Sequence, residues 1–203
     1  MAKRSSALYV VPLLLAAAAA GYMVSRQLSY QPPQLTVGTA MPEARPVPAF
    51  QLHDHNGAAF GNAELAGRPS LLFFGFTHCP DVCPTTLALM AQLVREPALS
   101  ALRPVFVTVD PDRDDQQALA QYVAAFGGGI TGLRGTEAEL APLLNGLLVA
   151  HAILPLPGGG YTVDHSASLY FLDTSGAWSA VFTPPFSLPA LKQDLTTLLA
   201  TGH

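Results

Sequence analysis

The sequence predicts an α/β domain that follows a hydrophobic N-terminal segment. Two continuous apolar runs, SLLFFGF over residues 70–76 and RPVFVTV over residues 103–109, are typical of strands buried on both faces of a parallel sheet. Segments with helical spacing of apolar residues alternate with these runs, which indicates βαβ units. The chain has 203 residues, of which 50% are hydrophobic and 12% charged, enough for one domain with its own core and a short appendage.

The first half of the domain is predicted to contain a hairpin and two strand–helix units. Residues 47–60 carry Asn56-Gly57 in the middle, the typical sequence of a tight hairpin turn. The first apolar run precedes a helix over residues 85–95. The second precedes a helix that Asp114 or Asp115 caps and that three glycines end after Phe126.

The second half is predicted to contain further short elements. Thr136 and Glu139 form a capping box for a helix that ends near Leu148, and Ser187 caps the last helix. In chain order we expect a strand over residues 130–134, this helix over 136–148 and a strand over 149–154. A hairpin over residues 168–172 and 177–182 and the last helix over 188–199 follow. Early βαβ units followed by a hairpin and a helix indicate a thioredoxin-like fold, here with an additional N-terminal hairpin.

The N-terminal segment predicts one transmembrane helix. Residues 7–24 read ALYVVPLLLAAAAAGYMV and carry no charge, near the lower length limit for a span. Lys3 and Arg4 precede this run, so the positive-inside rule places residues 1–6 in the cytoplasm and the domain on the far side. A cleaved signal peptide is the alternative, which we favour less because Tyr22 continues the apolar run.

Residues 25–46 are polar and rich in proline, and they predict a linker to a domain over residues 47–203. The net charge is −4 and the isoelectric point is about 5.8. Such a chain has no basic surface to attract phosphates, which excludes nucleic-acid binding.

The only two cysteines, Cys79 and Cys83, lie between the first apolar run and the helix that follows it. On a helix, residues four apart share a face, and a helix N-terminus lowers the pKa of a thiol. A structural disulfide closing so short a loop would stabilise little. A dithiol oxidoreductase usually has Cys-x-x-Cys, whereas two soft thiolates suit copper(I). Metal binding is therefore favoured, with the other two interpretations left open.

A histidine supplies the third candidate ligand. Val163-Asp164-His165-Ser166 precedes the last hairpin, where thioredoxin-like folds place a loop that faces the cysteines and normally carries a cis-proline. Imidazole is a good copper ligand, although His165 is also an ordinary residue for a polar loop. The other histidines are weaker candidates: His78 adjoins Cys79, His53 and His55 lie beside the Asn56-Gly57 turn, and His151 lies among apolar residues and is expected at a core or edge position.

Four segments together resemble the Sco/SenC family of copper proteins: FGFTHCPDVCPTTL (74–87), VTVDPDRDD (107–115), GLRGT (132–136) and VDHSASLYFLD (163–173). The resemblance implies a thioredoxin-like domain on one transmembrane helix, with copper held by Cys79, Cys83 and His165. It also implies a role in building the dinuclear copper centre (CuA) of cytochrome c oxidase. Asp110, Asp112 and Asp114 match an acidic loop of the family, either for partner docking or for capping the next helix.

We therefore expect a copper metallochaperone rather than an enzyme. Its expected partners are the copper-binding subunit of cytochrome c oxidase, an upstream copper carrier and a thiol reductant. We expect a bacterial inner-membrane protein with its domain in the periplasm, rather than a mitochondrial one. The alternatives are a membrane-anchored thiol–disulfide reductase that keeps the recipient's cysteines reduced, and a copper or redox sensor.

Overall fold

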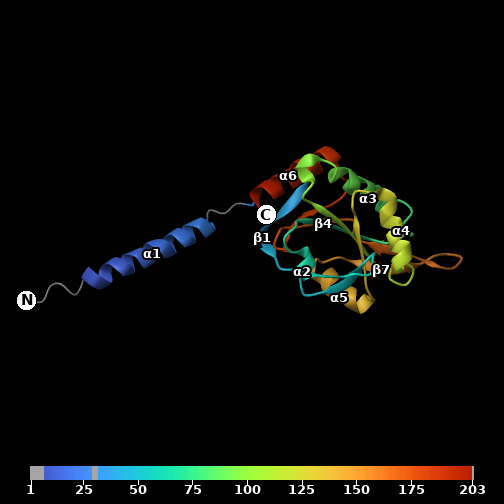
Figure 1. Cartoon of the computed structure of the whole chain (residues 1–203), viewed down its shortest axis with the longest axis horizontal. Helices are drawn as coiled ribbons and strands as arrows, with labels where there is room; N and C mark the ends of the chain where they lie inside the picture. Colours follow the sequence, from blue (N-terminus) through green and yellow to red (C-terminus); the bar gives the residue numbers. More distant parts are fainter. Residues whose placement is uncertain (1–6, 29–31, 203) are drawn as a thin grey trace, which may run out of the picture. The chain divides into compact units, whose positions relative to one another are not determined.

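The structure is a computed structural model that describes residues 7–28 and 32–202 of the chain (Figure 1). It divides into two units, Met1–Pro32 and Pro33–His203. In the first unit, Ala7–Leu28 form helix α1. No helix among the described residues has the length and apolarity needed to cross a membrane. The segment predicted to be cytoplasmic, residues 1–6, lies outside the described residues.

The second unit is built on a mixed sheet. In residues 32–202, eight strands form one sheet in the order β1-β10-β9-β4-β5-β6-β2-β3, and β7 and β8 form a separate hairpin. The three strands β4, β5 and β6 are parallel, and the other neighbours pair antiparallel. The strands are Gly38–Arg45 (β1), Gln51–Asp54 (β2), Ala59–Gly61 (β3), Ser70–Gly75 (β4), Arg103–Thr108 (β5), Thr131–Arg134 (β6), His151–Pro155 (β7), Tyr161–His165 (β8), Leu169–Leu172 (β9) and Trp178–Phe182 (β10).

Helices cover both faces of this sheet (Figure 1). The helices of this unit are Asn62–Leu65 (α2), Val82–Leu93 (α3), Gln116–Phe126 (α4), Glu137–Gly146 (α5) and Leu188–Thr201 (α6), with a 3-10 turn at Pro97–Leu99 (η1). The packing of α3, α4 and α6 buries one apolar cluster, which includes Phe73 and Phe106. On the opposite face α5 packs over a second cluster, which includes Phe74 and Val107. Alternate residues of β4 and β5 thus enter opposite clusters, which confirms the prediction of strands buried on both faces.

The caps predicted at Asp115 and Thr136 and the first hairpin are present, whereas Ser187 stands at the N-cap of α6 without a side-chain cap hydrogen bond. The carboxylate of Asp115 accepts the N–H of Ala118 at 2.7 Å, and Thr136 and Glu139 form the expected capping box. Strands β2 and β3 pair around the Asn56-Gly57 turn, where Gly57 has φ +87°. The α/β architecture of thioredoxin-like type is confirmed, with this hairpin at its N-terminal end.

The domain begins earlier than the sequence analysis places it. Residues 38–45 belong to the predicted linker, yet they form β1, the edge strand beside β10. Backbone hydrogen bonds hold this strand, and most of its side chains are exposed. A strand held in this way lacks the alternating apolar pattern, and Pro42 is tolerated because it stands on an edge. The sequence therefore offered no signal for it.

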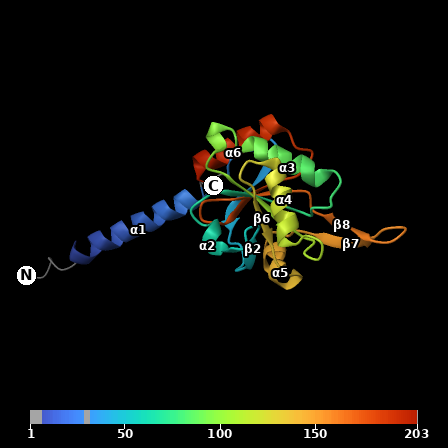
Figure 2. The same cartoon turned by 45° about the vertical axis from the view of Figure 1, so that its right-hand side comes forward.

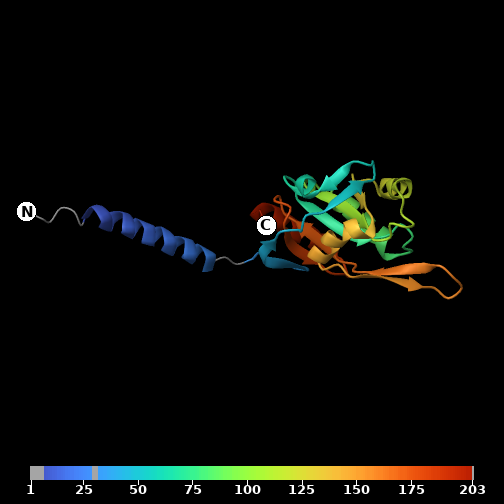
Figure 3. The ribbon, with the colours of Figure 1, turned by 90° about the horizontal axis from the view of Figure 1, so that it is seen from below.

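Three local differences affect the region of the candidate site. Strand β8 is absent from the predicted elements, and with β7 it forms a hairpin that projects from the body of the domain (Figures 2 and 3). Helix α3 begins at Val82, three residues before the predicted start. Helix α5 ends at Gly146, because Leu148 adopts a left-handed backbone conformation (φ 57°) that no helix continues.

Candidate metal centre

The two cysteines occupy different kinds of backbone. Cys79 lies in the loop after β4, where its N–H donates to the carbonyl of Phe76 at 3.2 Å. Cys83 lies in the first turn of α3 and is fully buried. The two cysteines do not share one helical face, because Cys79 precedes the helix. The thiols are free, with no disulfide between them.

Gly75 makes room for the buried thiol. A Cβ atom at this position would lie 2.6 Å from Sγ of Cys83, closer than carbon and sulfur can approach. The last residue of β4 must therefore lack a side chain for Cys83 to occupy its place beneath the loop.

His165 is the last residue of β8, and its ring is held on several sides. The edges of Phe73 and Phe76 meet the imidazole in T-shaped contacts, with ring centroids 6.0 and 5.9 Å away. Nδ1 lies 3.2 Å from the carbonyl oxygen of Ser166, so this nitrogen carries the proton and donates it. Nε2 is then left with its lone pair free, and it faces Sγ of Cys83 at 3.5 Å.

Three candidate ligand atoms meet at this point. The sulfurs of Cys79 and Cys83 and one nitrogen of His165 all lie within 4.8 Å of one another. Among the described residues this is the one such group of three His, Cys, Asp or Glu side chains. Cys83 and His165 are 82 residues apart in the sequence, so the tertiary fold is what brings them together.

Burial governs the protonation of this group. It raises the pKa of the Cys83 thiol far above its ordinary value, and it outweighs the lowering effect of the hydrogen bond with the Phe76 backbone. The expectation that the helix N-terminus lowers the thiol pKa is thus wrong for Cys83, because desolvation of the thiolate is the larger effect. Burial likewise lowers the pKa of His165, which keeps the imidazole neutral and able to bind a metal.

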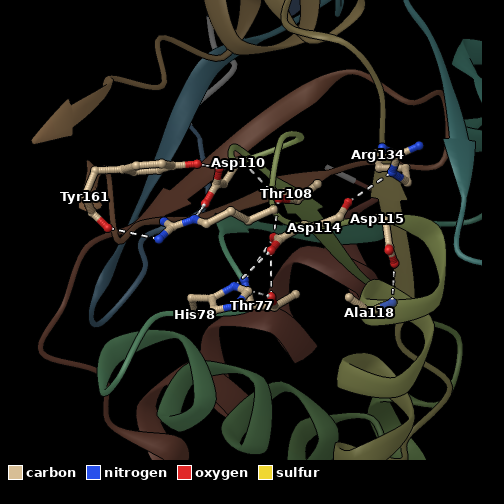
Figure 4. A network of polar contacts seen from close by, with 10 residues as sticks. Thr77, His78, Thr108, Asp110, Asp114, Asp115, Ala118, Arg134 and Tyr161 are labelled. Carbon is tan, nitrogen blue, oxygen red and sulfur yellow. Dashed lines mark hydrogen bonds and ion pairs between the residues drawn. The ribbon is translucent and has the colours of Figure 1, made fainter. Parts of the chain in front are cut away.

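A buried carboxylate holds the loop that carries Cys79. Asp114 is fully buried and accepts hydrogen bonds from the N–H of Thr77 at 2.9 Å, from its hydroxyl at 2.6 Å and from the hydroxyl of Thr108 at 2.5 Å (Figure 4). The ring of His78 lies 3.6 Å from the same carboxylate. Thr77 stands two residues before Cys79, so this network links the cysteine loop to the end of β5.

The same turn also holds the strand that carries His165. Arg113 donates from Nε to the buried Asp110 at 2.5 Å and from Nη1 to the carbonyl of Tyr161 at 2.9 Å. The hydroxyl of Tyr161 donates to Asp110 at 2.8 Å, and the guanidinium lies 3.8 Å from the centre of its ring. Tyr161 is the first residue of β8 and His165 the last. Residues 110–114 therefore support both the cysteine loop and the histidine strand.

Neither of the two interpretations of the acidic loop fits Asp110 and Asp114. Asp110 and Asp114 are buried and hydrogen-bonded within the domain, Asp115 caps α4, and Asp112 is exposed. Asp110 and Asp114 are thus neither docking groups nor caps. Their positioning role was not predicted from the sequence, where the Thr77 hydroxyl beside the cysteine motif was the available signal.

No other histidine among the described residues joins the group of three. His78 is exposed, and its ring lies against Thr77. His55 accepts the N–H of Gly132 at Nδ1. His151 is exposed on β7, an edge strand of the two-stranded β7-β8 hairpin, so it does not belong to the apolar core.

The fold and the site define a thioredoxin-like domain with two thiols and one imidazole gathered to bind a soft metal ion. The chain belongs to the SCO1/SenC family, whose model matches residues 39–200. It is 41% identical over 135 residues to the human protein "Protein SCO2 homolog, mitochondrial", a match that covers 64% of this chain and 51% of the relative. The chain thus spans about half the length of that relative.

Bacterial and structural relatives agree with this assignment. A Stutzerimonas stutzeri protein described as "Putative copper-binding protein" is 35% identical, over 78% of this chain and 79% of its own. The copper-bound ScoI structure from Arabidopsis thaliana matches with a TM-score of 0.71 and 26% identity, over 77% and 99% of the two chains. The copper-bound ScoI from Bradyrhizobium japonicum matches with a TM-score of 0.65 and 34% identity, over 76% and 98%.

Proposed function

We propose that this protein is a copper metallochaperone that binds one copper ion through Cys79, Cys83 and His165. The observation that carries this proposal is the convergence of two sulfurs and one ring nitrogen within 4.8 Å. Two thiolates and an imidazole are soft donors that suit copper(I). Copper bound to the ScoI relatives supports the same metal.

A three-coordinate site suits delivery rather than storage. An incoming thiolate can bind the ion before an outgoing ligand leaves, so copper passes on without being released to water. The carboxylate of Asp114 and the ion pair of Arg113 hold the ligands close to one another before copper arrives, which lowers the conformational entropy lost on binding.

Membership of the family extends the proposal to the assembly of cytochrome c oxidase. The recipient is its CuA-bearing subunit, with an upstream copper carrier and a thiol reductant as further partners. Residues 7–24 provide the proposed anchor, with the domain in the periplasm of a bacterium, on the strength of the apolar run and the basic residues before it. The relatives include both mitochondrial and bacterial proteins.

The reductase alternative is not favoured. Thiol–disulfide exchange requires a thiolate, and burial keeps the Cys83 thiol protonated and out of reach of another protein's sulfur, which leaves only the half-buried Cys79 to start the exchange. No enzymatic activity is proposed for this chain.

Metal analysis of reduced, anaerobic protein tests the proposal. Wild type should retain one copper per chain after gel filtration, and His165→Ala should lose most of it. His78→Ala is the matched control: its ring adjoins Cys79 in sequence but lies outside the donor group, so this variant should retain copper. Equal retention by wild type and His165→Ala would refute the assigned ligand set. Retention of thiol reductase activity without any copper binding would support the alternative.

A further inference from the structure

The hairpin that carries His165 presents a second imidazole beside it. His151 on β7 is the direct cross-strand partner of His165 on β8. The N–H of Ser166 donates to the carbonyl of Ala150 at 2.9 Å, which makes that neighbouring pair the hydrogen-bonded one. His151 and His165 therefore form a non-hydrogen-bonded pair, the kind in which opposing side chains stand on one face and lie closest together.

The two rings share a hollow that opens to solvent. A cavity of about 310 Å³ is lined by His151, Asp164 and His165 together with Ala150, Ala152 and Ser166. Asp164 is exposed and places a negative charge on this hollow, which favours a cation there. His151 is also exposed, so a solute can reach its ring before it reaches the half-buried ring of His165.

His151 also borders a second, larger hollow. That cavity of about 430 Å³ is lined by His53, Asp112, Glu137 and Glu139 among other residues. Its carboxylates outnumber its one arginine, Arg134, so the hollow raises the local concentration of cations near the base of the hairpin. His151 therefore stands between an acidic surface hollow and the buried donor group.

His151 does not complete the donor group itself. In the part of the chain that the structure describes, the group within 4.8 Å consists of Cys79, Cys83 and His165 alone. A ligand that is close to a three-coordinate site, but outside it, can bind the ion only as another ligand leaves. Such a ligand therefore takes part in ligand exchange at the ion.

We propose that His151 is a transit ligand for copper, through which the ion enters and leaves the donor group by way of His165. This inference rests on the proposed copper binding. In the outward step a bond forms between copper(I) and a ring nitrogen of His151, and then a bond to one of the three inner ligands breaks. Copper(I) keeps its oxidation state, so the exchange needs no oxidant or reductant.

Rapid-mixing kinetics test the proposal on the full chain in detergent, loaded with one copper(I) and mixed with the chromogenic chelator bathocuproine disulfonate. His151→Phe keeps a ring suited to a strand but removes both nitrogens. It should slow copper transfer by about tenfold while leaving the copper(I) affinity within about twofold of wild type. His53→Phe, on the border of the larger hollow, is the matched control and should transfer at the wild-type rate.

A second measurement tests the pairing of the rings directly. In a Cys79→Ser, Cys83→Ser variant, copper(II) should be bound by two imidazoles, and electron paramagnetic resonance should show hyperfine coupling to two nitrogens. Adding His151→Phe should leave one. An unchanged transfer rate, or a single nitrogen before His151 is replaced, would overturn the role of His151. Failure of wild type to bind copper would instead refute the proposed function, so the two failures are distinguishable.

Discussion

The replacement of Asp114 by alanine tests whether the turn after β5 organises the metal centre. The wild-type carboxylate is fully buried and accepts three hydrogen bonds, two from Thr77 and one from Thr108. Its removal takes the acceptor from the Thr77 N–H and from the buried Thr108 hydroxyl, whereas the hydroxyl of the half-buried Thr77 still lies 3.0 Å from Nδ1 of His78. Hydrogen bonds to charged groups contribute about 1.5–3 kcal/mol each, and the gain from no longer burying a charge offsets part of their loss.

We therefore expect Asp114→Ala to lower the free energy of unfolding by about 3–5 kcal/mol. With a urea m-value of about 2 kcal/mol/M, the midpoint of unfolding should fall by about 1.5–2.5 M. The assay is urea denaturation of the Pro33–His203 unit, followed by circular dichroism.

Asp112→Ala is the matched control, because Asp112 stands in the same acidic turn but is exposed. Its unfolding midpoint should equal that of wild type. Copper affinity should fall in Asp114→Ala and not in Asp112→Ala, under conditions where both are folded, because Thr77 then no longer fixes the loop of Cys79. Equal midpoints for the two variants would refute the reasoning.

Three further predictions concern the donor group and the edge of the sheet. Gly75→Ala should displace the Cys83 sulfur, which would lie 2.6 Å from the new methyl group, and should weaken copper(I) binding measured by chelator competition. The affinity of the wild type should rise as the pH increases from 6 to 8, by up to about tenfold per unit for each proton released, because burial raises the pKa of Cys83 and this thiol must lose its proton to copper. Competition by protons at His165 should appear only at lower pH, since burial lowers the pKa of this ring. Asp194→Ala should cost about 2–4 kcal/mol of stability at pH 7 in thermal unfolding, because this buried carboxylate accepts three backbone N–H groups at the start of β1.

Each of these predictions has a control or a contradicting outcome. Gly132→Ala overpacks the core against Leu119, away from the metal centre, and should lose stability without losing copper affinity. A copper(I) affinity that does not change with pH would contradict the protonated state of Cys83.

The contribution of Asp194 to the free energy of unfolding depends on pH in a direction that the pKa of its carboxyl determines. Burial raises its pKa, but the hydrogen bonds from three backbone N–H groups outweigh burial and leave the pKa below its ordinary value of 3.8. Its contribution is therefore fully present above that value and is lost as the pH falls through the lower pKa of the folded state. The difference between wild type and Asp194→Ala should shrink in acid, and a difference that stays constant would count against this account.

Patterns between near neighbours in the chain were enough to predict the central strands, the caps at Asp115 and Thr136 and the cysteine pair. His165 was predicted from its place in a thioredoxin-like fold and from the family resemblance. Strands β4 and β5 can be predicted from their own residues, because a strand buried on both faces is apolar at consecutive positions. The capping box of Thr136 and Glu139 is equally local, since both partners lie within one helical turn. Strand β1 could not be predicted, because its bonds run to β10, more than 130 residues further along the chain.

The sequence by itself determined the chemistry available to this protein: two thiols, an imidazole after a long separation, and a strand–loop–helix segment to carry the thiols. Only the tertiary structure decided that the three donor atoms meet within 4.8 Å, that Cys83 is buried deeply enough to hold its proton, and that Asp114 supports the site rather than a partner. The physical reason is that residue type and local spacing set which bonds a group can make. Burial and the register of distant strands set which bonds it does make, and both depend on the whole fold.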